Sequence, residues 1–166
     1  SELVRLAQAL ESRRDAEFKE LHIQCLQEQG ILFLQTGNYS QAEKSLLRAY
    51  EMVTPAIDRD DLKIELANNL AQVNDKLNIF DKALHYYEES LSRCRASYAA
   101  NSLPCVILLN NIAGIHAKED NLSAAIADYE QVIREFKNLL PASDPLYITA
   151  LNNLATAYRK NKELDM

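Results

Sequence analysis

Turn-forming residues are scarce in this chain. Of its 166 residues, three are glycine and four are proline. A β-sandwich or an up-and-down barrel needs a turn about every 8–12 residues, and glycine and proline form many of these turns. The sequence therefore argues against an all-β fold and predicts long helices. The length suits one domain or one stack of small repeating units, with enough apolar residues for a core.

Two further absences exclude classes of function. No apolar run approaches the roughly 18 residues that would span a bilayer, and the start of the chain does not resemble a signal peptide. Lysine and arginine number 18 against 24 aspartate and glutamate, which gives a net charge of −6. A general nucleic-acid-binding protein needs clustered excess basic residues to neutralise phosphates. We therefore expect neither a membrane span nor a nucleic-acid partner.

The three cysteines, Cys25, Cys94 and Cys105, are an odd number and lie far apart in the sequence. This pattern favours free thiols in a reducing compartment over a disulfide framework. We expect Cys25 and Cys94 to be small buried apolar side chains. The protein is predicted to be cytoplasmic.

No catalytic signature is present. The sequence contains no glycine-rich phosphate loop, no Gly-x-Ser-x-Gly elbow and no His-Glu-x-x-His. The histidines fall at unrelated helix positions, and the cysteines do not lie at metal-ligand spacing from them. We expect His116 to be structural and His85 to face outward. The chain is predicted not to be an enzyme and to hold no metal or cofactor.

The chain repeats itself at a nearly constant interval. The dipeptide Asn-Asn begins at residues 68, 110 and 152, so both intervals are 42 residues. Three other series keep this register with steps of 41 or 42: Tyr39, Phe80, Leu122 and Leu164; Ala42, Ala83 and Ala125; Lys76, Lys118 and Lys160. Independent series in one register identify a repeat protein.

Each repeat is predicted to contain two helices, because its apolar residues recur at spacings of three and four. Gly37 and Asn78 follow the first helices of two repeats and suit a left-handed C-cap. Asp144 and Pro145 suit the N-cap and the first position of a later helix, and Thr54-Pro55 and Ser102-Leu103-Pro104 mark the other junctions. The predicted helices are 18–35, 40–54, 60–76, 80–98, 103–118, 122–139 and 145–160, with a further amphipathic helix at 2–13.

One stretch of the chain resembles a tetratricopeptide repeat, whose signature includes a small residue, an aromatic, a turn glycine, a tyrosine and two alanines. The residues that carry the resemblance are Gly30-x-x-Phe33-x-x-x-Gly37-x-Tyr39-x-x-Ala42-x-x-x-Leu46-x-x-Ala49. The usual period of that family is 34 residues, and the longer period here resembles the kinesin light chain type. Asp144-Pro145 followed by Leu151-Asn152-Asn153-Leu154-Ala155 is similar to that type's inter-repeat loop and helix start. The period alone would also admit HEAT or armadillo repeats, whereas the Gly-x-Tyr-x-x-Ala turn favours the tetratricopeptide interpretation.

The resemblance implies an all-α fold, a right-handed superhelical solenoid of antiparallel helix pairs. The predicted units are 1–14 as one helix of an upstream unit, 18–56, 59–99 and 102–140 as three complete units, and 144–166 as the first helix of a truncated fourth. Neither end has the polar face that normally closes a solenoid. We therefore expect a piece of a longer array, whose open ends could pair with another copy.

The first helices of such a solenoid line a concave groove. On this surface the first asparagine of each pair, Asn68, Asn110 and Asn152, is predicted to form a ladder. A carboxamide both donates and accepts hydrogen bonds, so the ladder suits the main chain of an extended peptide. Groove asparagines clasp peptides in kinesin light chains and chaperone-binding tetratricopeptide domains, and the resemblance gives these three that role. The second asparagine of each pair is assigned to packing: Asn69, Asn111 and Asn153.

The other predicted groove residues lie on the same stripe of the first helices: Gln72, Lys76, Lys118, Thr156, Arg159 and Lys160. In the second repeat Glu65 and Asp75 offset Lys76. The cationic residues of the third and fourth repeats have no acid on the stripe, so acidic residues of a ligand should lie there. The lysines also fit a structural role at helix C-termini. The clamp for a C-terminal carboxylate is disfavoured, because Gln27 and Ile31 occupy its positions.

Taken together, these patterns predict a non-enzymatic interaction scaffold that binds an extended peptide of a partner protein, in the manner of a cargo adaptor. Two alternatives remain open at this stage. The solenoid could be a peptide-sensing regulatory domain, as in bacterial pheromone receptors. It could also be an assembly module of a cytoskeletal or ciliary complex.

Overall fold

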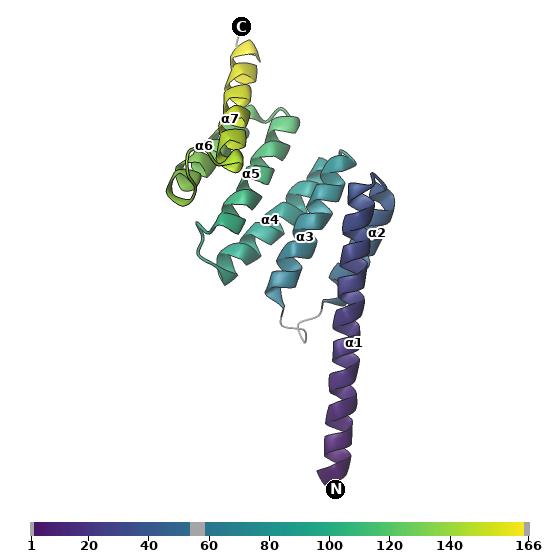
Figure 1. The fold of residues 1–166 in the computed structure, drawn as a ribbon. Helices are drawn as coiled ribbons and strands as arrows, with labels where there is room; N and C mark the ends of the chain where they lie inside the picture. The colour runs from purple at the N-terminus through teal and green to yellow at the C-terminus, as the bar shows by residue number, and fades with distance from the viewer. Residues whose placement is uncertain (1, 54–58, 165–166) are drawn as a thin grey trace.

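The computed structural model describes residues 2–53 and 59–164 of the chain, and all regular structure in these ranges is helical. In chain order the helices are α1 (Glu2–Gln35), α2 (Tyr39–Met52), α3 (Asp60–Lys76), α4 (Phe80–Ser97), α5 (Leu103–Lys118), α6 (Leu122–Leu139) and α7 (Pro145–Leu164). Each helix packs chiefly on the helices before and after it in the chain. Figure 1 shows the resulting row of helix pairs. The predicted all-α solenoid is therefore confirmed.

The turn within each helix pair is built in the same way. Gly37, Asn78 and Asp120 have positive φ angles of 78°, 58° and 58°. In each turn the next backbone amide donates to the carbonyl five residues earlier: Asn38 to Phe33 at 2.8 Å, Ile79 to Asn74 at 2.9 Å, and Asn121 to His116 at 2.9 Å. These bonds satisfy carbonyl groups at the helix end. The sequence predicted the first two turns, and the third uses an aspartate at the same repeat position.

Small residues at fixed repeat positions let the helices approach one another closely. The alanine series Ala42, Ala83 and Ala125 is fully buried. At Gly30 a Cβ atom would lie 2.5 Å from Cγ of Leu46 in α2, closer than atoms can pack. The contact between α1 and α2 therefore depends on the absence of a side chain at this position.

The N-terminal part of the fold differs from the prediction. Separate helices were expected at 2–13 and 18–35, whereas the structure has one continuous helix, α1. Residues 14–17, between the two predicted helices, contain no glycine or proline that would end a helix. As a result, the first half of α1 projects away from the stack and does not fold back as the helix of an upstream repeat (Figure 1). The predicted Thr54-Pro55 junction lies outside the described residues, and the unit boundaries remain a prediction.

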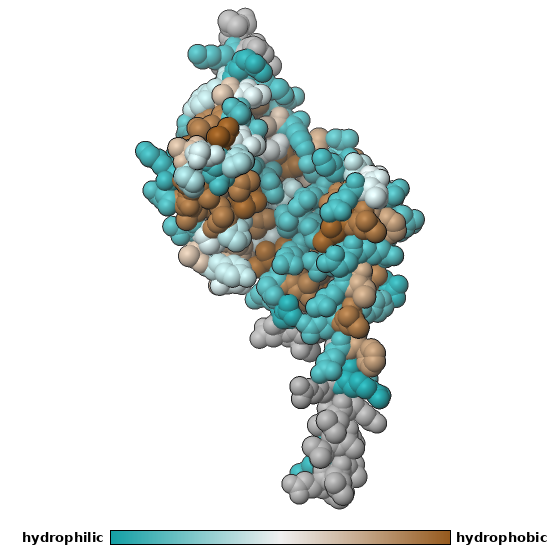
Figure 2. Space-filling model, viewed as in Figure 1, coloured by the Kyte–Doolittle hydropathy of each residue, from teal (hydrophilic) through white to brown (hydrophobic). Residues whose placement is uncertain are grey.

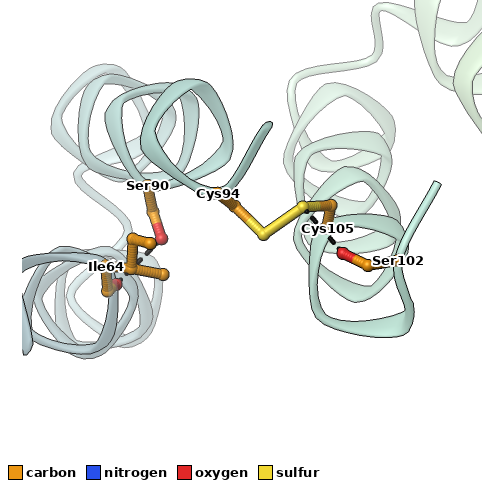
Figure 3. The surroundings of a disulfide bond; sticks show 5 residues. All are labelled: Ile64, Ser90, Cys94, Ser102 and Cys105. Atoms are coloured by element: carbon orange, nitrogen blue, oxygen red, sulfur yellow. Dashed lines mark hydrogen bonds between the residues drawn. A yellow bond between two sulfur atoms is a disulfide. The ribbon is translucent and has the colours of Figure 1, made fainter. Parts of the chain in front are cut away.

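The expectation of three free thiols is wrong. Cys94, in the last turn of α4, and Cys105, in the first turn of α5, form a disulfide with a Cα–Cα distance of 5.7 Å (Figure 3). Both residues are buried. They are eleven residues apart in sequence, and the turn between the helices makes them spatial neighbours. Cys25 has a free thiol and is exposed, not buried as predicted.

Candidate functional site

A mainly apolar hollow of about 290 Å³ lies between the N-terminal parts of α3 and α5. Its lining consists of Ile64, Glu65, Asn68, Leu103, Pro104, Ile107 and Leu108. Cys105 follows Pro104 directly, so the disulfide fixes the helix turn that forms one wall. Glu65 also accepts a hydrogen bond from Nε2 of Gln27 at 3.0 Å, which connects this site to α1.

Two smaller hollows continue along the C-terminal half of α5 toward α7. The first, of about 160 Å³, is lined by Asp75, Tyr87, Asn110, Asn111, Gly114, Ile115, Lys118, Tyr129 and Asn153. The second, of about 100 Å³, is lined by Ala117, Tyr129, Asn153, Thr156, Ala157 and Lys160. They adjoin each other, because Tyr129 and Asn153 line both. We call the surface formed by the three hollows the inner groove.

Asn68 and Asn110 have an unusual environment within the inner groove. The carboxamide oxygen of each is buried and has no hydrogen-bond partner. Buried polar atoms in proteins are nearly always hydrogen-bonded, so each exception needs an explanation. The oxygen of Asn74 is also buried and unpaired, but its amide nitrogen donates to the Leu70 carbonyl at 2.9 Å and the residue is fully enclosed. Asn74 is therefore out of reach of a ligand.

The structure brings together some of the predicted site residues but not all of them. Asn68, Asn110, Lys118, Thr156 and Lys160 line the inner groove. The remaining four do not line its hollows: Gln72, Lys76, Asn152 and Arg159. Asn152 is exposed on α7. Asn111 and Asn153, which were assigned to packing, are half-buried and also line hollows of the groove.

The predicted charge distribution along the groove is wrong at two lysines. Lys118 Nζ lies 2.6 Å from Oδ2 of Asp75 in the preceding repeat, and Lys160 Nζ lies 3.6 Å from Oδ1 of Asp120. Asp75 therefore pairs with Lys118 and not with Lys76 as expected. The prediction considered acids within one helix stripe, whereas the partners come from the neighbouring repeat and its turn.

Two tyrosines of the second helices contribute to the groove and were not predicted as site residues. Tyr87 of α4 and Tyr129 of α6 line the hollow beside Asn110, and they lie 42 residues apart. The repeat interval was the signal that could have found them. Burial raises the pKa of both phenols, so they stay neutral at physiological pH. A neutral phenol can donate one hydrogen bond and accept others.

The histidines lie where the sequence placed them. His116 Nδ1 is 2.9 Å from Oδ2 of Asp128, a contact that joins α5 to α6. His85 is exposed and lies edge-on to Tyr86. Among the described residues, no three histidine, cysteine or acidic side chains gather closely enough to hold a metal ion. Within residues 2–53 and 59–164, no helix has the length and hydropathy needed to cross a bilayer.

Comparison with known proteins identifies the type of repeat over part of the chain. Residues 25–96 match the tetratricopeptide repeat family. No curated protein matches the sequence. The fold is similar to that of putative kinesin light chain TPR-like repeats from Podosopora anserina, with 14% identity over 86% of this chain and 68% of that one, and a TM-score of 0.74.

Two further solved structures share the fold. BtubC (BKLC) from P. vanneervenii is 24% identical, and the match covers 93% of this chain and 63% of that one, with a TM-score of 0.73. A TPR-like protein from Chlorobium tepidum is 17% identical over 85% of this chain and 97% of that one, with a TM-score of 0.69. The resemblance in fold to kinesin light chain-like tetratricopeptide repeats is thus confirmed, and the family match covers residues 25–96. Repeats of this class indicate a protein–protein interaction scaffold, which is generally not enzymatic.

Proposed function

We propose that this chain binds an extended peptide segment of a partner protein in the inner groove, as a cargo adaptor would. The observation that carries the proposal is the pair of buried, unpaired carboxamide oxygens of Asn68 and Asn110. Both residues are half-buried and line the groove, so rotation of each carboxamide about its terminal bond would turn the oxygen from its buried position toward the free backbone N–H groups of an extended peptide. Neither side chain donates a hydrogen bond from its amide nitrogen within the described part of the chain, so each nitrogen remains available for a peptide carbonyl.

The hollow between α3 and α5 supplies a second element of recognition. It lies beside Asn68, its lining is mainly apolar, and its volume of about 290 Å³ accommodates a large aliphatic or aromatic side chain. A ligand held by its main chain at Asn68 would place an adjacent side chain in this hollow. Peptide grooves commonly combine main-chain hydrogen bonds with pockets for side chains in this way.

The ion pairs change the expected charge of the ligand. Lys118 and Lys160 are already paired with Asp75 and Asp120, so they attract acidic ligand residues less than two unpaired lysines would. We therefore place the main determinant of affinity at the apolar hollow. Acidic residues of the ligand would contribute a smaller preference toward α7, where Arg159 lies beside Lys160 in the sequence.

A fluorescence titration with short labelled peptides tests the proposal. Each peptide carries a single leucine, phenylalanine or tryptophan between neutral or acidic neighbours. Asn68→Ala and Asn110→Ala should each weaken binding about two- to tenfold, the range of one net hydrogen bond. Their thermal stability should be unchanged or higher, because each substitution removes a buried unsatisfied oxygen.

Asn152→Ala is the matched control, since it changes the same residue type at the same repeat position on an exposed surface. We expect it to leave affinity unchanged. Peptide binding that all three variants retain would contradict the groove assignment, as would a complete failure of the peptide panel to bind. A loss of stability in the Asn68 variant would indicate a structural role instead.

We propose a cytoplasmic location from the resemblance to kinesin light chain repeats. The disulfide opposes this location, because buried pairs of this kind persist mainly in oxidising compartments. Denaturing the protein directly from cells in the presence of an alkylating reagent, followed by mass spectrometry, distinguishes a cytoplasmic location from an oxidising compartment. A cytoplasmic protein should yield Cys94 and Cys105 as modified thiols after denaturation, whereas recovery of the intact disulfide would contradict the location.

A further inference from the structure

One face of α1 exposes large apolar side chains that the rest of the described chain does not cover. Phe18, Leu21 and Leu32 have exposed fractions of 65%, 56% and 58%, and Cys25 is also exposed. A helix turns by about 100° per residue, so these four residues lie within about 40° of one line along α1. We call them the α1 stripe. Figure 2 shows hydrophobic side chains on the surface along α1.

The α1 stripe lies opposite the face that packs into the solenoid. Ile23, Gln27 and Gly30 are buried and face α2 and α3. In an array of repeats, a preceding helix would normally cover the outer face. Here α1 continues as a straight helix through its first half, so residues 2–17 extend away and do not fold over the stripe. Its occupant must therefore come from outside the described chain.

The α1 stripe is self-complementary about Cys25. Phe18 precedes Cys25 by seven residues and Leu32 follows it by seven, so an antiparallel pair of α1 helices centred on Cys25 brings Phe18 of each copy against Leu32 of the other. In the same arrangement His22 and Glu28, three residues on either side of Cys25, face each other twice. Both side chains are exposed and of complementary character.

The surface of α1 also has a hollow at the N-terminal end of the α1 stripe. A depression of about 200 Å³ is lined by Arg14, Glu17, Phe18 and Leu21. These positions are i, i+3, i+4 and i+7, the four residues that form a hole in knobs-into-holes packing. The two-fold arrangement centred on Cys25 places Leu32 of the second copy over the middle of this hole.

We infer that the α1 stripe is a homodimer interface, in which two copies of this chain pair their α1 helices antiparallel about Cys25. This association uses the outer face of α1 and leaves the inner groove of each copy open. It is therefore independent of peptide binding. A single helix pair forms an interface below the standard size, so the dimer should be weak and concentration-dependent.

Sedimentation equilibrium of the whole chain at protein concentrations up to about 500 µM measures this association, since weak interfaces require such concentrations. Phe18→Glu and Leu32→Glu should each lower the association constant by at least about tenfold, because each residue is buried twice in the symmetric dimer. Leu146→Glu, which changes an exposed apolar residue on α7 (42% exposed), is the matched control and should not alter it. Circular dichroism should remain helical in all three, since the altered side chains are exposed.

Charge reversal tests the antiparallel register. His22→Glu should weaken the dimer because it places two glutamates opposite one another, and Glu28→Lys should weaken it because it removes the acceptor for the imidazole N–H. The double variant restores an opposite-charge pair at both sites and should recover the association. A parallel or differently registered dimer would show no such recovery, and this result would overturn the inference.

Cross-linking locates the two-fold axis. A short bis-maleimide should link two copies through Cys25, whereas a Cys25→Ser, Ser92→Cys variant should not cross-link, because Ser92 is exposed on α4, away from the stripe. A protein that stays monomeric throughout, or a dimer that survives both Phe18→Glu and Leu32→Glu, would contradict the interface.

Discussion

The two junctions between the first three helix pairs differ in the contacts that accompany their apolar cores. Between the first and second repeats, Tyr50 of α2 donates to Glu89 of α4. Arg93 of α4 lies 3.0 Å from Glu89 and 3.1 Å from Asp60 of α3. Between the second and third repeats, the Cys94–Cys105 disulfide lies in an apolar cluster that includes Val106 and Phe136. Both junctions also have an apolar core, since Leu46 of α2 and Leu66 of α3 belong to one buried cluster at the first. The first junction adds a polar network that water partly reaches, and the second adds a covalent bond.

This difference indicates which junction between repeats is more rigid. Ion pairs that water reaches contribute little stability, because solvent screens them and their long side chains must be ordered. Buried apolar contacts contribute more and are present at both junctions, so the disulfide, which closes a short loop, is the stabilising feature that only the second junction has. The second junction carries one wall of the hollow between α3 and α5, since Leu103 and Pro104 adjoin Cys105. Relative motion of the repeats is therefore expected to be smallest at the second junction, where the disulfide joins α4 to α5.

Removing the disulfide should have the largest effect. For a separation of eleven residues, the loop-entropy model gives a loss of about 3 kcal/mol in the free energy of unfolding, or about 6–12 °C in Tm for a chain of this size. The comparison is made by calorimetry in a Cys25→Ser background, with and without dithiothreitol. An unchanged Tm after complete reduction would show that the apolar cluster alone holds the second junction.

Removing the central cation of the polar network should have a smaller effect. Arg93→Met should lower the free energy of unfolding by about 1 kcal/mol, the upper range for partly exposed pairs, and should increase amide hydrogen exchange in α2 and α3. Arg95→Met, on an exposed position of the same helix, is the matched control. If Arg93→Met destabilised the protein as much as reduction of the disulfide, the contrast between the junctions would fail.

The smallest expected effect is the pH dependence of the stability that Glu89 gives to the first junction. Partial burial tends to raise the pKa of Glu89, but hydrogen bonds from Tyr50 and Arg93 outweigh it and hold the pKa below its ordinary value of 4.5. The lowered pKa stabilises the folded state above pH 4.5, and this contribution is lost as the pH falls through the folded-state pKa.

Thermal melts of the wild-type protein and the Glu89→Gln variant measure this contribution. The wild-type advantage in Tm should be largest near neutral pH and should shrink as the pH falls below about 4.5. A difference that stayed constant down to pH 3 would mean that ionisation of Glu89 does not stabilise the junction.

The repeat register predicted most of the fold, because it fixes both periodicity and turn positions. Gly37 and Asn78 identified two helix ends directly, since few residues adopt a positive φ without strain. The disulfide was not predicted, because the number and the sequence spacing of the cysteines do not show which helix ends lie close together in space. The length of α1 was also missed, because its amphipathic pattern weakens in the middle while nothing there stops the helix.

The groove was predictable in part for the same reason. Register placed Asn68 and Asn110 on the inner helices, where the structure has them. Asn152 shares that register but is exposed, because no described helix beyond α7 completes a hollow around it. The pairing of Lys118 with Asp75 joins residues 43 positions apart, and such contacts between repeats depend on side-chain reach that a helix-by-helix pattern does not contain.

The central claim is that the carboxamides of Asn68 and Asn110 form hydrogen bonds with the main chain of a bound peptide. Two-dimensional ¹⁵N–¹H spectra of the side-chain amides, recorded while a peptide of the labelled panel is added, test it most directly. Resonances of Asn68 and Asn110 should shift together and saturate with the binding curve, whereas those of Asn101 and Asn152, both exposed, should stay in place. Saturable binding that leaves the Asn68 and Asn110 resonances unmoved would contradict the account.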